Sequence, residues 1–245
     1  SCKTEKKISF MGEAQGTYYA VTYFDVNARD FQQEIDSLLR QFDLSASLWE
    51  PLSVVSRINQ NDSGSQVDEI VAALFEMSYK VAEKSMGSFD ITVGSLVNAW
   101  GFGFREGIEP DSSKIDSLMQ YVGYHKVMLD GNFLRKESPE VSIDFNAIAQ
   151  GYSVDLIGEF LEKQGVENYL VDVGGEVLAK GRKPNKGPWV IGVEKPTTDP
   201  YDERKLQIKI ELKDKAIATS GSYRKFFVKD GIRYSHTINP LTGYA

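Results

Sequence analysis

Cysteine and histidine are scarce in this sequence: its 245 residues include one cysteine and two histidines. A single cysteine excludes an internal disulfide and any metal centre built from several cysteines. Long apolar runs are also missing, because no stretch approaches the roughly 20 residues that a membrane-spanning helix needs. The chain has no Gly-x-Gly-x-x-Gly loop, no Walker A loop, no nucleophile elbow and no metal-type histidine pair. The familiar dinucleotide, nucleotide and hydrolase sites are therefore not indicated.

An excess of positive charge is absent as well. Lys and Arg number 28 against 35 Asp and Glu, which gives a formal net charge of −7. This balance provides no electrostatic footprint for nucleic acid, and we expect no nucleic-acid partner. An acidic protein that handles a phosphorylated ligand must supply positive charge locally, from a metal ion or from helix N-termini.

The one cysteine, Cys2, stands before the polar run Lys3-Thr4-Glu5-Lys6-Lys7. This arrangement is typical of a mature bacterial lipoprotein, and a chance surface cysteine in a frayed terminus is the alternative. We expect residues 1–11 to form a flexible lipoprotein tether. We also expect an exported protein on the periplasmic side of a membrane, which it contacts only through a lipid on Cys2.

Hydrophobic patterning predicts both helices and strands. One helix is expected to begin near Asn27. Three more are expected over 68–84, 112–120 and 146–164, and Gly165 is expected to end the last of them. The strands are expected over 18–25, 141–144, 169–173, 177–179, 189–193 and 206–212, with hairpins over 128–135 and 226–236 and mostly loop over 43–66. The fold class is therefore α+β, with mixed or antiparallel sheets flanked by helices. The length suits one large domain or two packed ones, and we expect one domain over 12–245.

The segment 142–155 concentrates polar groups at a helix start. Asp144 ends the expected strand, where its carboxylate could cap the helix or face a ligand. Ala147 and Gly151 have small side chains, so a ligand can approach the backbone at the start of the helix. Gln150 can both donate and accept hydrogen bonds. On local grounds both interpretations of Asp144 stay open.

Several other segments carry weaker signals. Gly174-Gly175 indicates a hairpin turn, and 218–222 offers hydroxyl and amide groups of the kind that bind phosphate. A lone histidine is more often structural than catalytic, so His236 is a weak candidate and His125 is treated as structural. The glycine-dense segment 87–103 carries large apolar residues, which favours tight backbone paths near a bound group over a flexible linker.

Taken in order, these segments resemble the ApbE family, the FAD:protein FMN transferases, from about Gly12 to Tyr244. Members begin with a Met-Gly-Thr turn, here Gln15-Gly16-Thr17. The further blocks are the serine-rich motif Ser47 to Asn59, the Gly-x-Phe-Asp-x-Thr-Val-Gly-x-Leu motif Gly87 to Leu96, the helix start from Asp144 to Asp155, Gly174-Gly175, Thr219-Ser220-Gly221, and the ending His236 to Gly243. Seven ordered blocks with near-matching spacing make the resemblance specific, although each block is modest by itself.

The resemblance implies a T-fold-like architecture and a defined activity. Members bind FAD and a divalent metal, normally Mg²⁺, and move the FMN half of FAD onto a Thr or Ser hydroxyl of a target protein, releasing AMP. An exported acceptor protein is implied as partner. By this likeness the residues that line the FAD site are Gln15, Trp49, Ser88, Phe89, Asp90, Asp144, Gln150 and Ile238.

The likeness also implies roles for single groups. Ala147 would offer its backbone carbonyl to the metal. His236 would deprotonate the incoming hydroxyl or orient the phosphate, and Asp144 is the second catalytic candidate. Trp49 stands where members often carry Tyr, and its aromatic face can stack on a flavin or adenine ring.

Two departures from the family pattern stand out. Gln15 occupies the position of the usual Met, and Gln150 that of the frequent Lys, and both can still hydrogen-bond a flavin or its ribityl chain. Members also continue past the Pro-x-Thr-Gly turn with a segment that supplies the remaining metal ligands. We therefore expect further metal ligands beyond Ala245, in a longer form of the chain.

Three other functions stay open. A FAD pyrophosphatase would use water in place of the acceptor hydroxyl and would give FMN and AMP. A non-catalytic FAD-binding lipoprotein would hold FAD without turnover. A structural or adhesion lipoprotein lies outside flavin chemistry altogether, and the ordered motifs disfavour it.

Overall fold

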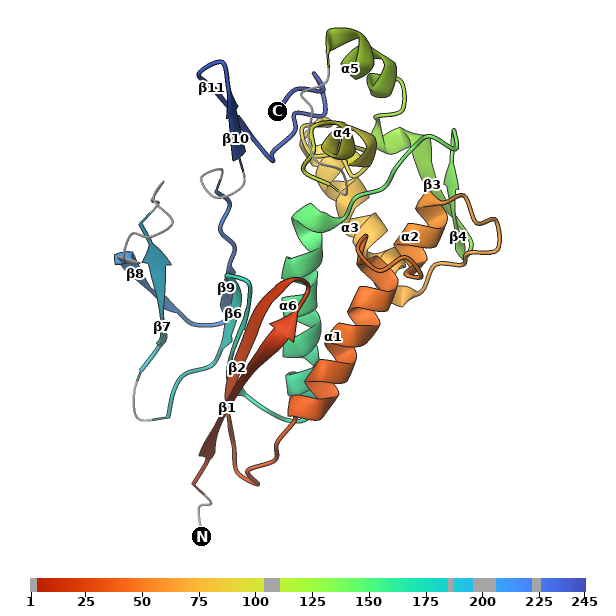
Figure 1. Ribbon diagram of the computed structural model, residues 1–245. Helices are drawn as coiled ribbons and strands as arrows, with labels where there is room; N and C mark the ends of the chain where they lie inside the picture. Colours follow the sequence, from red (N-terminus) through yellow and green to blue (C-terminus); the bar gives the residue numbers. More distant parts are fainter. Residues whose placement is uncertain (1–3, 104–110, 185–186, 196–205, 222–225) are drawn as a thin grey trace. The chain divides into compact units, whose positions relative to one another are not determined.

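The computed structural model describes residues 4–103, 111–184, 187–195, 206–221 and 226–245 (Figure 1). Contacts group the chain into two compact units. Unit 1 takes the described residues within Ser1–Phe42 and Ala149–Ser220, and unit 2 takes those within Asp43–Ile148 and Gly221–Ala245. Each unit therefore combines segments that are far apart in the sequence.

Unit 1 contains a five-stranded sheet in which every neighbouring pair is antiparallel. Its strand order is β1-β2-β5-β6-β9, with β1 Lys6–Ala14, β2 Thr17–Asp25, β5 Asn168–Val173, β6 Glu176–Lys180 and β9 Lys215–Ile217. The strands predicted over 18–25, 169–173 and 177–179 are confirmed. Strand β9 is only three residues long and was not predicted.

Strand β1 corrects the expected N-terminal tether. Residues 6–11 belong to this strand, which pairs with β2 from Lys6 opposite Asp25 to Ala14 opposite Thr17. Its alternate residues, among them Ile8 and Phe10, pack against the core of the unit. Pairing with a neighbouring strand stabilises β1, and a local sequence window carries no signal for that partner.

Helices α1 (Gln32–Ala46) and α6 (Asn146–Lys163) pack on one face of this sheet (Figure 1). Alternate residues of β2 and β5 face the helices, because successive side chains of a strand point to opposite faces. The buried core on this face consists of Tyr19, Val21, Tyr23, Phe31, Ile35, Leu39, Val154, Ile157, Leu161, Val166, Tyr169, Val171 and Val173. The helix predicted over 146–164 is confirmed, and Gly165 follows it in the left-handed region at φ +79°.

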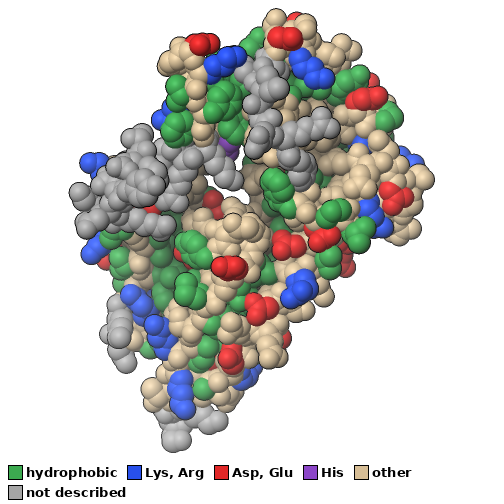
Figure 2. Space-filling model, in the orientation of Figure 1, with side chains coloured by type: hydrophobic (Ala, Val, Ile, Leu, Met, Phe, Trp, Pro, Cys, Tyr) green, Lys and Arg blue, Asp and Glu red, His purple; other side chains and the backbone are tan. Residues whose placement is uncertain are grey.

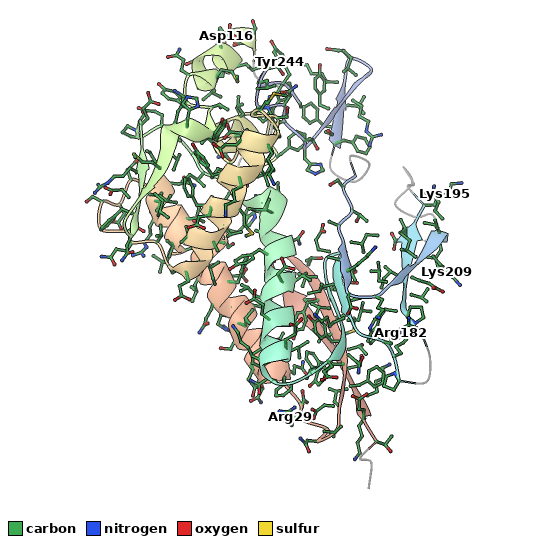
Figure 3. The ribbon with its side chains drawn as sticks, turned by 180° about the vertical axis from the view of Figure 1, so that it is seen from behind. Arg29, Asp116, Arg182, Lys195, Lys209 and Tyr244 are labelled. Atoms are coloured by element: carbon green, nitrogen blue, oxygen red, sulfur yellow. The ribbon has the colours of Figure 1, made fainter. Side chains whose placement is uncertain are left out.

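Helix α1 begins later than predicted, at Gln32 rather than near Asn27. The carboxylate of Asp25, at the end of β2, accepts the backbone N–H groups of Asn27 and Arg29 and pairs with the Arg29 guanidinium. These bonds hold the connection as a loop, and Asp30 then accepts the N–H of Gln32. Figure 3 shows Arg29 near this end of the helix.

The opposite face of the sheet carries a two-stranded ribbon formed by β7 (Trp189–Glu194) and β8 (Leu206–Leu212). Trp189 is buried against β6. The strict alternation of apolar and polar residues over 206–212 predicted a half-buried strand. The strand is confirmed, but Leu206 and Ile208 are 55% and 54% exposed, so only the end of β8 is buried.

Unit 2 combines one long helix and several short ones with two hairpins. Its elements are α2 (Val54–Asn59), α3 (Glu69–Lys84), α4 (Gly94–Ala99), α5 (Ser112–Met119), the 3-10 turn η1 (Tyr124–Lys126), β3 (Val127–Asp130), β4 (Phe133–Lys136), β10 (Phe226–Lys229) and β11 (Ile232–Ser235). The helices predicted over 68–84 and 112–120 and both hairpins are confirmed. Asp68 caps α3 by accepting the N–H of Val71 at 2.9 Å. These elements, with the antiparallel sheet of unit 1, confirm the α+β class.

One local prediction for unit 2 is incomplete and one is wrong. Residues 43–66, expected as mostly loop, do lie mostly outside helices and strands, but they also contain the end of α1 and all of α2, which begins where Ser53 Oγ accepts the N–H of Ser56. Residues 141–144, expected as a strand, form a single parallel bridge to Val93. One bonded pair does not make a ladder, so this segment is extended but is held mainly by other contacts.

Acidic and basic side chains are interspersed over the face drawn in Figure 2. Within the described ranges, none of the helices is long and apolar enough to cross a membrane. Cys2, the expected lipid attachment point, lies outside the described residues.

Candidate functional site

The predicted site residues divide between the two units. Unit 1 contains Gln15 and Gln150. Unit 2 contains the others, namely Trp49, Ser88, Phe89, Asp90, Asp144, Ala147, His236 and Ile238.

Asp144 precedes α6 and is 9% exposed. Its Oδ1 accepts the backbone N–H of Asn146 at 2.7 Å, as a helix cap does. Burial raises the pKa of the Asp144 carboxyl group, and hydrogen bonds from Asn146 oppose this effect only in part. The residue also lines a pocket, so capping the helix does not exclude facing a ligand.

The backbone before Asp144 is held by residues far away in the sequence. The Asn59 side chain donates from Nδ2 to the carbonyl of Ile143 and accepts the Ile143 N–H at Oδ1, both at 2.8 Å. The N–H of Asp144 donates to the carbonyl of Ile91 at 2.7 Å. These bonds fix the position of Asp144 relative to α2 and to the residues before α4.

A tight turn between α1 and α2 presents Trp49. Ser53 Oγ donates to the carbonyl of Ser47 at 2.7 Å, and Ser56 Oγ donates to the same carbonyl at 3.3 Å. These bonds close the turn and leave Trp49 64% exposed. An exposed indole offers a stacking surface for a planar ring.

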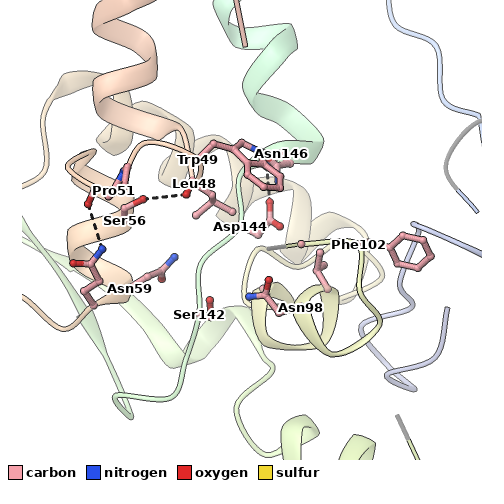
Figure 4. A pocket seen from close by; sticks show the side chains of 14 residues that line it. Leu48, Trp49, Pro51, Ser56, Asn59, Asn98, Phe102, Ser142, Asp144 and Asn146 are labelled. Carbon is pink, nitrogen blue, oxygen red and sulfur yellow. Dashed lines mark hydrogen bonds between the residues drawn. The ribbon is translucent and has the colours of Figure 1, made fainter. Parts of the chain in front are cut away.

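Trp49 and Asp144 line the same pocket, which has a volume of about 320 Å³ (Figure 4). The walls come from the turn after α1, from α2, from α4 and its C-terminal end, and from the segment before α6. The lining residues are Leu48, Trp49, Pro51, Ser56, Asn59, Gln60, Gly94, Val97, Asn98, Phe102, Gly103, Ser142, Asp144 and Asn146. Seven of these fourteen residues have amide, hydroxyl or carboxyl side chains and the others are apolar or glycine, so the pocket offers a small molecule both hydrogen-bonding groups and apolar surface.

The predicted residues before α4 have different surroundings. Asp90 is buried, and its Oδ1 accepts the N–H and the hydroxyl of Thr92 at 2.8 and 2.6 Å. Thr92 Oγ1 accepts the N–H of Gly123 at 2.7 Å. The Asp90 carboxylate therefore organises a turn. Phe89 is half-buried, and Ser88 is exposed.

The C-terminal segment carries His236 and Ile238. Ile238 is buried, and together with Ser88 it lines a second hollow of about 390 Å³. His236 is half-buried, and its ring stands edge-on to Phe102, at 73° and with ring centroids 6.4 Å apart. Because Phe102 lines the Asp144 pocket, His236 contacts one wall of that pocket.

An aromatic cluster anchors this segment on α4. The Nε1 of Trp100 donates to the carbonyl of Gly243 at 2.8 Å. The Trp100 ring centroid lies 5.3 Å from that of Tyr234 and 6.5 Å from that of Phe227. The cluster therefore sets the position from which His236 approaches Phe102.

In unit 1, Gln15 and Gln150 lie at the same end of the five-stranded sheet. Gln15 is in the β1–β2 turn at φ +54°, and both polar atoms of its amide are buried with no hydrogen-bond partner among the described residues. The Nε2 of Gln150 lies against the β5–β6 turn, because a Cβ added to Gly174 would come within 2.9 Å of it.

Ala147 lies exposed in the first turn of α6. In the described part of the chain, no three His, Cys, Asp or Glu side chains form a group that could hold a metal ion. Mg²⁺, however, commonly takes one or two carboxylates and completes its shell with substrate phosphates and water. A carboxyl group at Asp144 and a carbonyl at Ala147 are such hard oxygen donors, and a cation would favour the ionised Asp144 that burial disfavours. The donor chemistry therefore fits the expected ion.

Sequence reasoning does not single out Asn59, Asn98 or Phe102 as pocket residues. Asn59 is the last residue of the serine-rich motif, and this position is the one sequence feature that could have indicated it as a pocket residue. Its partner Ile143 lies 84 residues away, and only the fold brings the two together. Glu176 has a carboxyl oxygen that is buried with no hydrogen-bond partner among the described residues, and it also carries no local signal.

Known proteins resemble this chain over nearly its whole length. A sequence model of the ApbE family matches residues 15–245. The FAD:protein FMN transferase of Vibrio cholerae serotype O1 is 36% identical over 249 residues, which cover 98% of this chain and 74% of that protein. The protein of the same name from Haemophilus influenzae is 36% identical over 259 residues, covering 100% of this chain and 74% of that one.

Solved structures agree with this result. The flavin transferase ApbE from Vibrio cholerae has a TM-score of 0.85 and 34% identity, over 98% of this chain and 78% of that one. The apo form of the flavinyl transferase ApbE from Pseudomonas stutzeri has a TM-score of 0.86 and 34% identity, over 100% of this chain and 78% of that one. The family match, the sequence identity and the shared fold lead to one conclusion. The chain belongs to the ApbE family.

Proposed function

We propose that this chain transfers the FMN half of FAD to a Thr or Ser hydroxyl of an acceptor protein and releases AMP. The observation that carries the proposal is one pocket that combines the exposed ring of Trp49 with the buried carboxyl group of Asp144, in a member of the ApbE family. The relatives from Vibrio cholerae and Haemophilus influenzae carry names that state this transfer.

The transfer is a displacement at phosphorus. The acceptor hydroxyl oxygen forms a bond to the phosphorus of the FMN half, and the bond from that phosphorus to the bridging oxygen breaks. AMP leaves with the electron pair. The hydroxyl proton needs a base, and we assign this role to His236, which contacts the pocket wall at Phe102.

The pocket residues bind and orient the substrate in this proposal. Trp49 offers its face to a ring of FAD. At the start of α6 the N–H of Asn146 is already bonded to Asp144, and the N–H of Ile148 to the carbonyl of Phe145 at 2.9 Å. The diphosphate charge therefore needs a further partner. A divalent cation such as Mg²⁺, held by the Asp144 carboxyl group and the Ala147 carbonyl, would neutralise that charge.

Product analysis tests the proposal. The full-length protein is incubated with FAD, Mg²⁺ and a Thr-containing acceptor domain, and the acceptor is examined by intact mass and in-gel fluorescence. We expect an FMN-sized adduct on the acceptor together with AMP, and loss of the adduct when EDTA replaces Mg²⁺. Free FMN with AMP and an unmodified acceptor would mean hydrolysis, and unchanged bound FAD would mean storage. Either result would contradict the proposal.

We also propose that the protein is an exported lipoprotein, anchored by a lipid on Cys2, that acts on an exported acceptor. The single cysteine before a polar run supports this. Expression with a native leader should place the wild type in the membrane fraction and release a Cys2→Ser variant. Equal membrane retention of both would reject the anchor.

A further inference from the structure

The two edges of the five-stranded sheet of unit 1 differ in length. Strand β9 forms one edge and has three residues, whereas β1 forms the other edge and has nine. A very short edge strand offers little for another strand to pair with, and proteins commonly protect sheet edges in this way. Strand β1 lacks this protection. Among the described residues, β2 is the only strand that pairs with it.

Strand β1 also lacks the irregularities that usually disrupt an exposed edge. It contains no proline, and its register with β2 runs from Lys6 opposite Asp25 to Ala14 opposite Thr17 without a bulge. The ribbon of β7 and β8, by contrast, has a register shift. A long and regular edge strand is a template on which a further strand can pair.

The free backbone groups of β1 belong to every second residue. Tyr18, opposite Glu13, directs its carbonyl toward β5, where this carbonyl accepts the N–H of Gly174 at 3.0 Å. Bonded and non-bonded pairs alternate along an antiparallel ladder. Glu13 and Tyr18 are therefore a non-bonded pair, and the N–H and C=O of Glu13 point to the open edge. By the same alternation, the residues with outward backbone groups are Lys7, Ser9, Met11 and Glu13.

The side chains of these four residues are exposed. They lie on the face of β1 that is turned away from the core, because the intervening Ile8 and Phe10 pack against that core. Opposite charges stand near the two ends of this row, with Lys7 at the start and Glu13 at the end. The row therefore carries a basic end and an acidic end.

A second copy of β1 fits this edge in an antiparallel register. Bonding across the edge requires that residues with outward groups stand opposite one another. A two-fold axis at Phe10 sets Lys7 opposite Glu13 of the second copy, and Ser9 opposite Met11. Each residue with outward groups then donates one backbone bond and accepts one. The opposite charges also meet twice, directly across the strand pair, where such pairs stabilise a sheet.

Other registers lose this match. An axis at Ser9 sets Lys7 opposite Met11, and an axis at Met11 sets Glu13 opposite Ser9. Neither register forms the ion pairs. A parallel pairing in register sets Lys7 beside the Lys7 of the second copy, which is unfavourable. The two charges therefore select one register.

We propose that two copies of this chain associate by antiparallel pairing of β1 with β1, across a two-fold axis at Phe10, so that their five-stranded sheets become one continuous sheet. Apolar groups meet there as well. Phe10 stands opposite its counterpart, and the side chain of Met11, which is 68% exposed, lies diagonal to its own. A single strand pair buries less surface than a stable interface of standard size, so the dimer forms reversibly. No ligand takes part in the contact.

Sedimentation equilibrium of the unlipidated protein tests the proposal, in a reducing buffer that prevents a disulfide through Cys2. At low ionic strength the mass should rise from 27.4 kDa toward twice that value as the protein concentration is raised to roughly 500 µM. Met11→Pro should stay monomeric, because proline removes an outward N–H that β2 does not use. Met11→Ala keeps this N–H and is the matched control, which should still dimerise.

Charge reversal tests the register and does not depend on a proline in the strand. Lys7→Glu sets an acidic side chain opposite Glu13 of the second copy, so the dimer should be at least about tenfold weaker. Adding Glu13→Lys exchanges the two charges and should restore dimerisation. Lys80→Glu, at an exposed position of α3, changes the net charge by the same amount and should behave as the wild type.

Three results would overturn the inference. The first is a wild type that stays monomeric up to the highest concentration, including the case in which β1 pairs with a strand of another protein instead. The second is a Met11→Pro variant that is folded by far-UV circular dichroism and dimerises like the wild type. The third is a double variant that dimerises no better than Lys7→Glu, which would place the contact in another register or on another surface.

Discussion

Asp144 combines two roles in one buried carboxyl group. It caps the start of α6 through Asn146, and it lines the pocket with Trp49. Because burial raises its pKa, the charged form is disfavoured unless a positive charge is near. In the proposed function, a cation bound together with the negatively charged diphosphate would supply that positive charge.

The Asp144→Asn variant should be more stable than the wild type at pH 8 when flavin and metal are absent, because burial raises the pKa of the Asp144 carboxyl group. The folded-state pKa of Asp144 lies above its unfolded value, so the free energy of unfolding of the wild type falls as pH rises between these two values. Asn does not ionise, so the difference should shrink below about pH 4. Urea unfolding in EDTA across this pH range measures it. If the difference in the free energy of unfolding between the variant and the wild type did not change with pH, the raised pKa of Asp144 would be contradicted.

Asn59 should be the main support of the backbone before Asp144. Asn59→Ala leaves the N–H and the carbonyl of Ile143 without their 2.8 Å partners, so we expect a loss of about 2–4 kcal/mol in the free energy of unfolding. The neighbouring Gln60 is exposed and donates to the carbonyl of Pro51 at 3.2 Å. Gln60→Ala should therefore cost less than about 0.5 kcal/mol. If the two variants unfolded at the same denaturant concentration, the support would lie elsewhere.

Only part of the site could be predicted from sequence at this scale. The ordered motifs nominate Trp49 and Asp144, because both stand inside quoted blocks. They do not reveal that the two residues line one pocket, which depends on the pairing of Asn59 with Ile143 across the fold. They also do not reveal that the Gln15 amide is buried without a partner among the described residues, since burial depends on packing.

Among the helices, α4 packs closely on the segment before α6. A Cβ at Gly94 would lie 2.7 Å from the Oγ and 2.9 Å from the carbonyl oxygen of Ser142. Gly94→Ala should therefore destabilise the protein by about 1–3 kcal/mol, because backbone must move. At Gly151, within α6, an added Cβ meets nothing within 4 Å, so Gly151→Ala should stabilise by about 0.5–1 kcal/mol. Thermal unfolding measures the change in melting temperature of each variant relative to the wild type. A change of the same sign in Gly94→Ala and Gly151→Ala would refute the close contact at Gly94.

Elements were predictable where their ends carry a local signal. Asp68 marks the start of α3, Gly165 the end of α6, and Gly131 the turn between β3 and β4. Strand β1 and helix α2 carry no comparable signal. The strand depends on pairing with β2, and the short helix stands in a serine-rich segment that favours loops.

At the scale of the whole molecule, composition and periodicity were enough for the fold class. Helical and strand periods both occur, and the net charge of −7 disfavours a nucleic-acid partner. The division into two units was not predictable, because each unit combines two separate stretches of the chain. The same negative charge opposes an anionic substrate, which is why the account depends on local positive charge near Asp144.

The central claim is that the Asp144 pocket holds FAD, and equilibrium binding of FAD in the presence of Mg²⁺ tests it most directly. Asp144→Ala should bind FAD at least tenfold more weakly than the wild type, an effect of about 1.4 kcal/mol or more. Asp116→Ala, at an exposed position of α5, should bind as the wild type does, and far-UV circular dichroism should confirm that both variants are folded. Undiminished FAD affinity in a folded Asp144→Ala would contradict the claim.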